Sequence, residues 1–496
     1  MRILGISSMF HDAAVSVVDR GEIVFAAHAE RYSKQKNDPF INSDLINAAL
    51  EHGEPDVIVL HEKHWLKCLR NIYAGNWSSL REPSAEKWIR DFYPQLKHIP
   101  IISPYIHHET HAGAGVLTSG YSEAAVMVID AIGEFDTATI WHWRNNRLKK
   151  RHSVRFPHSL GLFYSAVTAH CGLKPMEDEY ILMGMAAYGD PEQAKLIKQQ
   201  MEADFFKDDH SLRMRVNLQR GLPAGYDHHD DFDMAMAAQQ ICEERIYQYA
   251  HRAKQLTGSD NLVYMGGVAL NCVANGALFD WFQNIHIMPN PGDAGSALGA
   301  AALFHHTCTG ETVKWPGAYL GYEIPGKYPV KRALKSALAG EIFGVANGRA
   351  EYGPRALGNR SLMADPRGPE IKDRMNEIKK RQKFRPFAPV ILEEHVHDYF
   401  DMPAGCTSAY MQFVATCKYP EQFPAIIHHD GTSRVQTVNQ EQNPGLYELL
   451  TKFYKKTGCP MLVNTSLNIK GQPIVNDEAD AQAFAEHYGV QVHTSD

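Results

Sequence analysis

The chain has 496 residues, 44% of them hydrophobic, which is enough to bury the cores of two or three domains. Its formal charge of −7 argues against a protein that coats duplex nucleic acid, because such binding depends mostly on Lys and Arg neutralising phosphates. Eight cysteines without a CxxC pair argue against a disulfide framework and a Cys-based zinc site. No apolar run reaches about 18 residues and the start lacks a secretory pattern, so we expect a cytoplasmic protein without membrane association.

The first 60 residues predict several short strands around one helix at about 42–52. The β-forming stretches are 2–7, 14–18, 22–28 and 56–60. A strand, a short polar loop and a strand are how actin-like ATPase and sugar-kinase folds begin, with the loop facing the ligand. His11 and Asp12 lie in this loop, where ordinary turn chemistry is the alternative interpretation. Lys36, in the charged loop that follows 22–28, is an uncertain site residue.

Three histidines stand close together in the run HHETH, which begins at residue 107. If 107–120 is helical, His107 and His111 lie on one face, where two ring nitrogens can converge on one ion. The zinc-protease motif would need a histidine at position 112, which is Ala112. Because such a pair is more often structural, a metal site here needs further ligands.

Two aspartates supply the expected further ligands. The buried-type strand 125–129 ends in Asp130, and the returning strand 137–143 follows, so the layout of the N-terminus is repeated as in a duplicated fold. Asp293 stands just before a helix rich in Gly and Ala. Two imidazoles and two carboxylates suit iron or another divalent first-row metal, with coordination positions left open. Turn or helix capping is the alternative role for each aspartate.

A glycine pair in 261–276 predicts a turn after a strand. Gly266 and Gly267 would let the backbone approach a nucleotide, with Asn271 beside them and Gly133 in the other loop. A glycine pair alone is weak evidence. Helices are expected within 159–191 and at 232–256.

The C-terminal part begins with a predicted linker at 302–340 and a strand at 342–346. Between residues 341 and 390 there are eleven Lys and Arg against six Asp and Glu. Several arginines stand among glycines and prolines, in GPRALGNR from residue 353 and KFRPFAP from residue 383. Such loops suit a phosphate-rich substrate, although a basic count alone would also fit a solvated face.

The blocks HHETH, GGVALN, NPGDAGSALGAA and GPRALGNR resemble the O-carbamoyltransferases of the nodulation-protein and antibiotic-biosynthesis type. HHDGTSRVQTV and LVNTSLN match as well, so the resemblance covers nearly the whole chain. It implies an α/β protein with two domains. Residues 1–325 would have the actin-like ATPase (duplicated ribonuclease-H-like) fold and relate to the tRNA threonylcarbamoyl transferase subunit. Residues 326–496 would be similar to threonylcarbamoyl-AMP synthase.

The resemblance also implies a two-stage reaction. Carbamoyl phosphate and MgATP would give carbamoyl-AMP in the C-terminal domain, and a hydroxyl would take the carbamoyl group in the N-terminal one. A metal, usually taken as iron, would be held by His107, His111, Asp130 and Asp293. The implied catalytic residues are His11, Arg355 and Ser466. The implied ligands of carbamoyl phosphate and ATP are Arg355, Asn359, Arg385, Arg434, Asn464, Ser466 and Asn468.

The acceptor is open: an antibiotic, an oligosaccharide or a hydroxymethylated nucleotide would fit, and a homodimer is one possibility. Two rival functions remain, a tRNA-threonylcarbamoylation-like enzyme and a non-catalytic actin-like nucleotide switch. The chain departs from the family at Ile181, where a Lys is usual, and at the turn 407–411. The first departure bears on the acceptor or nucleotide pocket.

Overall fold

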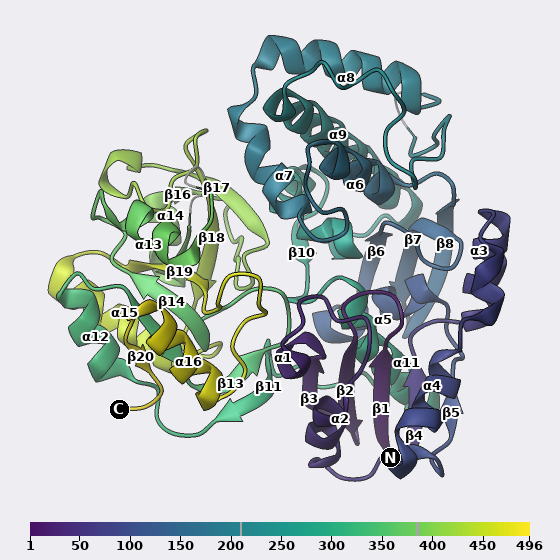
Figure 1. The fold of residues 1–496 in the computed structure, drawn as a ribbon, viewed down its shortest axis with the longest axis horizontal. Helices are drawn as coiled ribbons and strands as arrows, with labels where there is room; N and C mark the ends of the chain where they lie inside the picture. The colour runs from purple at the N-terminus through teal and green to yellow at the C-terminus, as the bar shows by residue number, and fades with distance from the viewer. Residues whose placement is uncertain (209–210, 383–384, 386) are drawn as a thin grey trace. The chain divides into compact units, whose positions relative to one another are not determined.

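The computed structural model describes residues 1–208, 211–382, 385 and 387–496. It is a mixed α/β structure, as predicted, and divides into two compact units (Figure 1). The larger unit comprises Met1–Val24 and Pro39–Trp315, and the smaller unit comprises Phe25–Asp38 and Pro316–Asp496. In the KFRPFAP motif, Lys383, Phe384 and Pro386 lie outside the described residues.

Two five-stranded sheets share one connectivity, in the orders β3-β2-β1-β4-β5 and β8-β7-β6-β9-β10. The first contains β1 (Arg2–Ser7), β2 (Ala14–Asp19), β3 (Glu22–His28), β4 (Val57–Leu60) and β5 (Ile101–Ile102). The second contains β6 (Glu123–Ile129), β7 (Asp136–Arg144), β8 (Arg147–Arg155), β9 (Asn261–Met265) and β10 (Asn284–His286). In each, the central strand pairs antiparallel with the next strand and parallel with a later one. The predicted duplication is therefore confirmed.

The predicted strands form because their side chains can be buried on both faces, as the patterns of β1, β4 and β6 show. The sequence does not predict β8, because RLKKRHSVR looks too polar for a strand. This strand lies at the edge of its sheet and exposes every second residue of its first five, which are Arg147, Lys149 and Arg151. Charges on an edge strand discourage pairing with another chain.

Helices α5 (His107–Ser119) and α11 (Ser296–Thr309) pack directly against each other. Helix α11 also packs on β1 and β2, whereas α5 packs on β6 and β9. A side chain at Gly299 would place its Cβ 1.9 Å from the carbonyl oxygen of Thr110. The close approach of the two helices therefore requires glycine at this position, which agrees with the predicted Gly- and Ala-rich packing.

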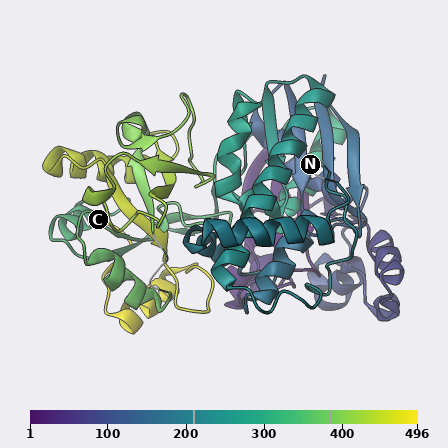
Figure 2. The ribbon, with the colours of Figure 1, turned by 90° about the horizontal axis from the view of Figure 1, so that it is seen from above.

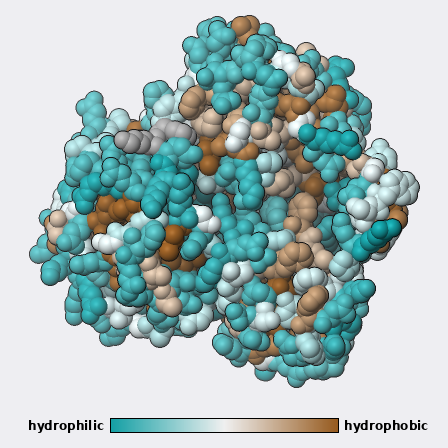
Figure 3. Space-filling model, viewed as in Figure 1, coloured by the Kyte–Doolittle hydropathy of each residue, from teal (hydrophilic) through white to brown (hydrophobic). Residues whose placement is uncertain are grey.

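The remaining helices of the larger unit surround these layers. They are α2 (Ser43–Leu50), α3 (His64–Tyr73), α4 (Ala85–Phe92), α6 (Leu160–His170), α7 (Glu179–Met185), α8 (Pro191–Phe205), α9 (Asp231–Thr257) and α10 (Cys272–Asn275). Helix α9 packs against α6, α7 and α8 (Figures 1 and 2). The turn after Gly266 leads through a short 3-10 segment into α10, which is only four residues long. The visible surface is mostly hydrophilic (Figure 3), and no helix among the described residues is long and apolar enough to cross a membrane.

The smaller unit is built on an eight-stranded sheet in the order β16-β17-β18-β15-β19-β14-β12-β20. Its strands are β12 (Phe343–Ala346), β14 (Arg360–Ala364), β15 (Ala388–Leu392), β16 (Phe400–Asp401), β17 (Phe413–Cys417), β18 (Thr432–Val438), β19 (Met461–Ser466) and β20 (Val492–His493). A separate pair joins β11 (Tyr319–Ile324) and β13 (Gly348–Glu351). The helices are α1 (Glu30–Ser33), α12 (Val330–Leu338), α13 (Ile371–Lys379), α14 (Val396–Tyr399), α15 (Pro444–Thr457) and α16 (Glu478–Tyr488).

The predicted linker at 302–340 is wrong. Helix α11 continues to Thr309, and β11 and α12 lie within the rest of the range. Leu320 and Ala333 are completely buried. The Gly, Pro and Lys residues that suggested a linker belong to short turns between these elements and to the exposed face of α12.

Candidate functional site

The histidine run forms the first turns of α5, as predicted. His107 and His111 are buried, and their Nε2 atoms lie 3.0 Å apart. Glu134 accepts hydrogen bonds from the backbone N–H of His107, at 2.9 and 3.0 Å, and from that of Lys63 at 3.0 Å. A carboxylate at this end of a helix complements its dipole, so Glu134 holds the turn that presents the imidazoles.

Two carboxylates face the imidazoles from other elements. Asp130 follows β6 and accepts the N–H of Ala131 at 2.7 Å through Oδ1, while Oδ2 lies 3.1 Å from His111 Nε2 and 3.4 Å from His107 Nε2. Asp293 Oδ1 lies 3.1 and 3.2 Å from the same two nitrogens. No side chain caps the start of α11, so Asp293 is not a helix cap.

The four side chains form a candidate metal site, because their ligand atoms all lie within 4.8 Å of one another and all four residues are buried. His111 Nδ1–H donates to the carbonyl oxygen of Pro291 at 3.0 Å, which leaves the Nε2 lone pair for an ion. Burial raises the pKa of Asp293, but the nearby imidazoles outweigh it and lower that pKa to about 2. Two imidazole nitrogens and two carboxylates therefore fit a divalent cation.

The predicted nucleotide loops lie close to these ligands. Gly133 packs on α5, where a Cβ would be 3.0 Å from His108 Cδ2, and Gly266 has φ +90° beside the carbonyl of Ile129. Gly267 donates its N–H to Asp130 Oδ1 at 3.4 Å. The Asn271 amide exchanges two hydrogen bonds of 3.0 Å with Gln239, so its side chain also holds α9 to the turn.

His11 lies in the β1–β2 loop, with Nδ1 3.1 Å from Asp12 Oδ2 and its side chain 29% exposed. Burial alone would lower its pKa, but the hydrogen bond and charge of Asp12, with the charges of Asp293 and Asp130, raise it to about 9. The charges of Asp130 and Asp293, both in the candidate metal site, therefore act on His11.

A second candidate site lies in the smaller unit around Ser466, at the end of β19. Lys379 donates to the Ser466 carbonyl oxygen at 2.6 Å and to its Oγ at 3.2 Å, and also contacts the Asn468 side-chain oxygen. Burial lowers the pKa of Lys379 well below its usual value, and the positive charges of Arg381 and Arg385 lower it further. A bound phosphate would favour the charged form of Lys379 again, so this amine and the two guanidinium groups are suited to phosphate oxygens. Lys379 is not among the predicted site residues, because IKDRMNEIKK has the composition of a solvated helix.

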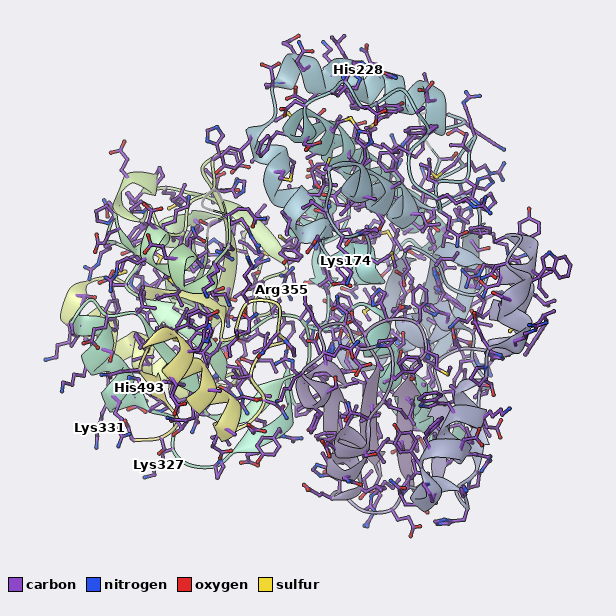
Figure 4. The ribbon with its side chains drawn as sticks, in the orientation of Figure 1. Lys174, His228, Lys327, Lys331, Arg355 and His493 are labelled. Atoms are coloured by element: carbon purple, nitrogen blue, oxygen red, sulfur yellow. The ribbon has the colours of Figure 1, made fainter. Side chains whose placement is uncertain are left out.

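The other predicted residues of this unit have varied surroundings. Arg434 Nε and Asn464 Oδ1 are buried without a hydrogen-bond partner among the described residues, which leaves them available to a ligand. Asn359 instead bridges the Arg349 carbonyl and the Asn443 side chain. Arg355, labelled in Figure 4, is half-buried in the loop between β13 and β14.

Arg360, at the end of the GPRALGNR block, has a structural environment. It is completely buried and donates to the carbonyl oxygens of Tyr322, Asn347, Gly348, Asn359 and Asn476. Lys36 is exposed in the segment Phe25–Asp38, and Ile181 is buried in α7.

The fold and the two sites define an α/β protein with a candidate metal site in one unit and a cluster of basic side chains around the buried Lys379 in the other. Family comparison identifies the class. The carbamoyltransferase N-terminus model matches residues 2–67 and 58–302, and the carbamoyltransferase C-terminus model matches residues 335–494. The chain belongs to the carbamoyltransferase family and is a transferase.

The relatives match between 76% and 97% of the chain. An uncharacterised Synechocystis protein is 34% identical over 97% of this chain and 93% of its own length. The nodulation protein NolO of Bradyrhizobium diazoefficiens is 34% identical over 76% of this chain and 75% of its own. The 3'-hydroxymethylcephem-O-carbamoyltransferase of Amycolatopsis lactamdurans is 28% identical over 97% and 95%.

Proposed function

We propose that the chain is an ATP-dependent O-carbamoyltransferase that works through carbamoyl-AMP. One observation carries the proposal: Lys379 and Ser466 belong to the smaller unit, whereas the imidazole and carboxylate cluster around His107 belongs to the larger unit. A cationic site suits the activation of phosphates, and a divalent-cation site suits the polarisation of a carbonyl. Membership of the carbamoyltransferase family connects the two chemistries.

The first stage belongs to the smaller unit. Water would cleave carbamoyl phosphate to carbamate and phosphate. A carbamate oxygen would then attack the α-phosphorus of MgATP, forming carbamoyl-AMP and releasing pyrophosphate. Lys379, Arg385 and Ser466 would bind the oxygens on which negative charge develops, with Arg355 and Arg434 as further donors.

The second stage belongs to the larger unit. The acceptor oxygen would attack the carbamoyl carbon, the bond to AMP would break, and the hydroxyl proton would pass to His11. A divalent ion bound by His107, His111, Asp130 and Asp293 would supply Lewis acidity to the carbamoyl group. The raised pKa of His11 depends partly on the charges of Asp130 and Asp293, which such an ion would offset. Iron is our first candidate for this ion.

The acceptor is proposed to be a hydroxyl-bearing small molecule, sugar or nucleotide. This follows the relatives, one of which is named for carbamoyl transfer to a hydroxymethylcephem. A tRNA-modifying function is less consistent with the net charge of −7. A nucleotide switch without chemistry would not explain the buried Lys379 and the basic side chains beside Ser466.

The test is to incubate the purified chain with ATP and carbamoyl phosphate. We expect pyrophosphate to form only when both substrates are present, and AMP to appear when an acceptor alcohol is added. Hydrolysis of ATP that is indifferent to carbamoyl phosphate would favour the switch. Substrate use restricted to threonine and bicarbonate would favour the tRNA-modifying class.

A further inference from the structure

The segment Phe25–Asp38 is part of the smaller unit although it lies near the N-terminus of the chain. Arg31, in α1, is 2% exposed and donates from Nη2 to the carbonyl oxygen of Gly353 at 3.0 Å. Lys34 donates to the Arg31 carbonyl oxygen at 2.9 Å and forms an ion pair with Asp480. Arg31 and Lys34 therefore each anchor the segment, Arg31 on the loop after β13 and Lys34 on α16.

The burial of Arg31 is energetically unfavourable. Its Nε lies 3.6 Å from Glu30 Oε1, and neither Nε nor Nη1 has a hydrogen-bond partner among the described residues. Burying a guanidinium with unfilled donors costs free energy that an apolar side chain would avoid. Its position therefore calls for a role beyond holding α1 in place.

The loop on which Arg31 acts carries Arg355. On one side of Arg355, Arg31 holds the Gly353 carbonyl oxygen. On the other side, Glu351 Oε1 accepts the backbone N–H groups of Leu357, Asn359 and Arg360 at 2.7, 2.9 and 3.2 Å. Arg355 is thus the half-buried residue between two tethered stretches of backbone.

We propose that Arg31 is a positioning residue that holds the Gly353–Arg355 backbone so that Arg355 is preorganised for the phosphates of the substrate. This inference rests on the proposed adenylate-forming function of the smaller unit. A guanidinium placed in advance loses less conformational freedom on binding, so the tether acts on substrate affinity. The N-terminal part of the chain thereby contributes to the C-terminal site.

The functional test compares Arg31→Gln with Lys34→Ala in the full chain. Both changes remove an anchor of the same segment, but only the first releases Gly353. We expect Arg31→Gln to raise the KM for carbamoyl phosphate in pyrophosphate release by about 10- to 100-fold, the range set by loss of a charged hydrogen bond. Lys34→Ala should stay within about twofold of the parent. Arg31→Lys, which keeps one charged donor, should recover most of the loss and serves if Arg31→Gln does not fold.

Equal effects of Arg31→Gln and Lys34→Ala on KM would overturn the proposal, because Arg31 would then only dock the segment. Amide hydrogen exchange in residues 353–359 provides a readout that needs no activity. We expect faster exchange there in Arg31→Gln and parental exchange in Lys34→Ala. Parental exchange in Arg31→Gln would overturn the inference, whereas a parent chain that makes no carbamoyl-AMP would overturn the proposed function alone.

Discussion

The charge state of His11 decides when it can act as a base. An imidazole accepts a proton only when it is neutral, and Asp12 favours the charged form of His11. The same carboxylate can fix the orientation of the ring. Asp12 therefore helps to position His11 but reduces the fraction of neutral His11. Transfer catalysed by His11 should rise with pH until the pKa of the residue has been passed.

We therefore expect Asp12→Asn to move the rising limb of the pH–rate profile to lower pH. The substitution removes the carboxylate that raises the pKa of His11, so the neutral base is present at lower pH. The measurement is carbamoyl transfer from supplied carbamoyl-AMP across pH. Asp44→Asn, on the exposed start of α2, is the control and should leave the limb unchanged. A limb that stays in place in Asp12→Asn would argue against His11 as the base.

Metal content should depend on His107 and His111, whose rings converge, and not on the neighbouring His108. His107→Ala and His111→Ala each remove one of the four ligands, so bound metal and carbamoyl transfer should both fall. His108→Gln changes a buried histidine of the same helix whose Nδ1 is 3.0 Å from Thr139 Oγ1, outside the ligand set. Elemental analysis should find parental metal content only in His108→Gln, while pyrophosphate release persists in all three.

Adenylate formation should depend on the buried ammonium of the smaller unit. We expect Lys379→Met to slow pyrophosphate release by roughly 10²–10³-fold, since a buried donor to developing negative charge is lost. Lys380→Met, one position along the chain and exposed, should cost little. Transfer from supplied carbamoyl-AMP should survive in both variants. Equal losses of both half-reactions in folded Lys379→Met would contradict the division of labour between the units.

Among the helices and strands, the sequence predicts those whose hydrophobic period and composition are characteristic of one type of element. The buried runs of Val, Ile and Ala allowed β1, β2, β4 and β6 to be located, because a strand buried on both faces has few alternatives. Helix α5 and its four-residue spacing of histidines could also be predicted. Short elements with charged faces, such as β8 and α12, could not be predicted. Their polar residues do not show which face of the element packs against the rest of the protein.

The same limit explains the site. The ligands on α5, after β6 and before α11 could be proposed because each follows a local pattern and the family resemblance joins them. Lys379 could not be found, since nothing in its local sequence shows that the last turn of α13 is covered by the chain after β19. The structural role of Asn271 was hidden for the same reason, because its partner Gln239 is 32 residues away.

The contact between α5 and α11 gives a test at this scale. In Gly299→Ala the added Cβ would meet the Thr110 carbonyl oxygen, so the helices must separate. We expect a loss of about 1–3 kcal/mol in the free energy of unfolding, with lower metal content, because both helices position ligands. Gly276→Ala adds a Cβ that meets nothing within 4 Å and should be nearly neutral. Thermal unfolding and elemental analysis distinguish the two variants.

At the scale of the whole molecule, the chain passes between the units after residues 24, 38 and 315. Cutting it once therefore does not separate the units. If a protease site is inserted before the exposed Pro316 and cleaved, we expect both fragments to elute together in size-exclusion chromatography. The N-terminal fragment would still supply Phe25–Asp38 to the smaller unit. Separate elution of the parental fragments would contradict this expectation, and Arg31→Gln with Lys34→Ala should weaken the association.

During protein synthesis, Arg31 is made well before Gly353, the residue that it binds. The two residues are 322 positions apart, so the segment around Arg31 leaves the ribosome long before its binding surface exists. At a translation rate of about 5–20 residues per second, the delay is roughly 15–60 s. During that interval β3, whose first residues belong to the larger unit, is followed by a charged stretch without its native neighbours. A nascent chain halted before residue 353 should accordingly be more sensitive to proteolysis at 29–38 than the finished protein.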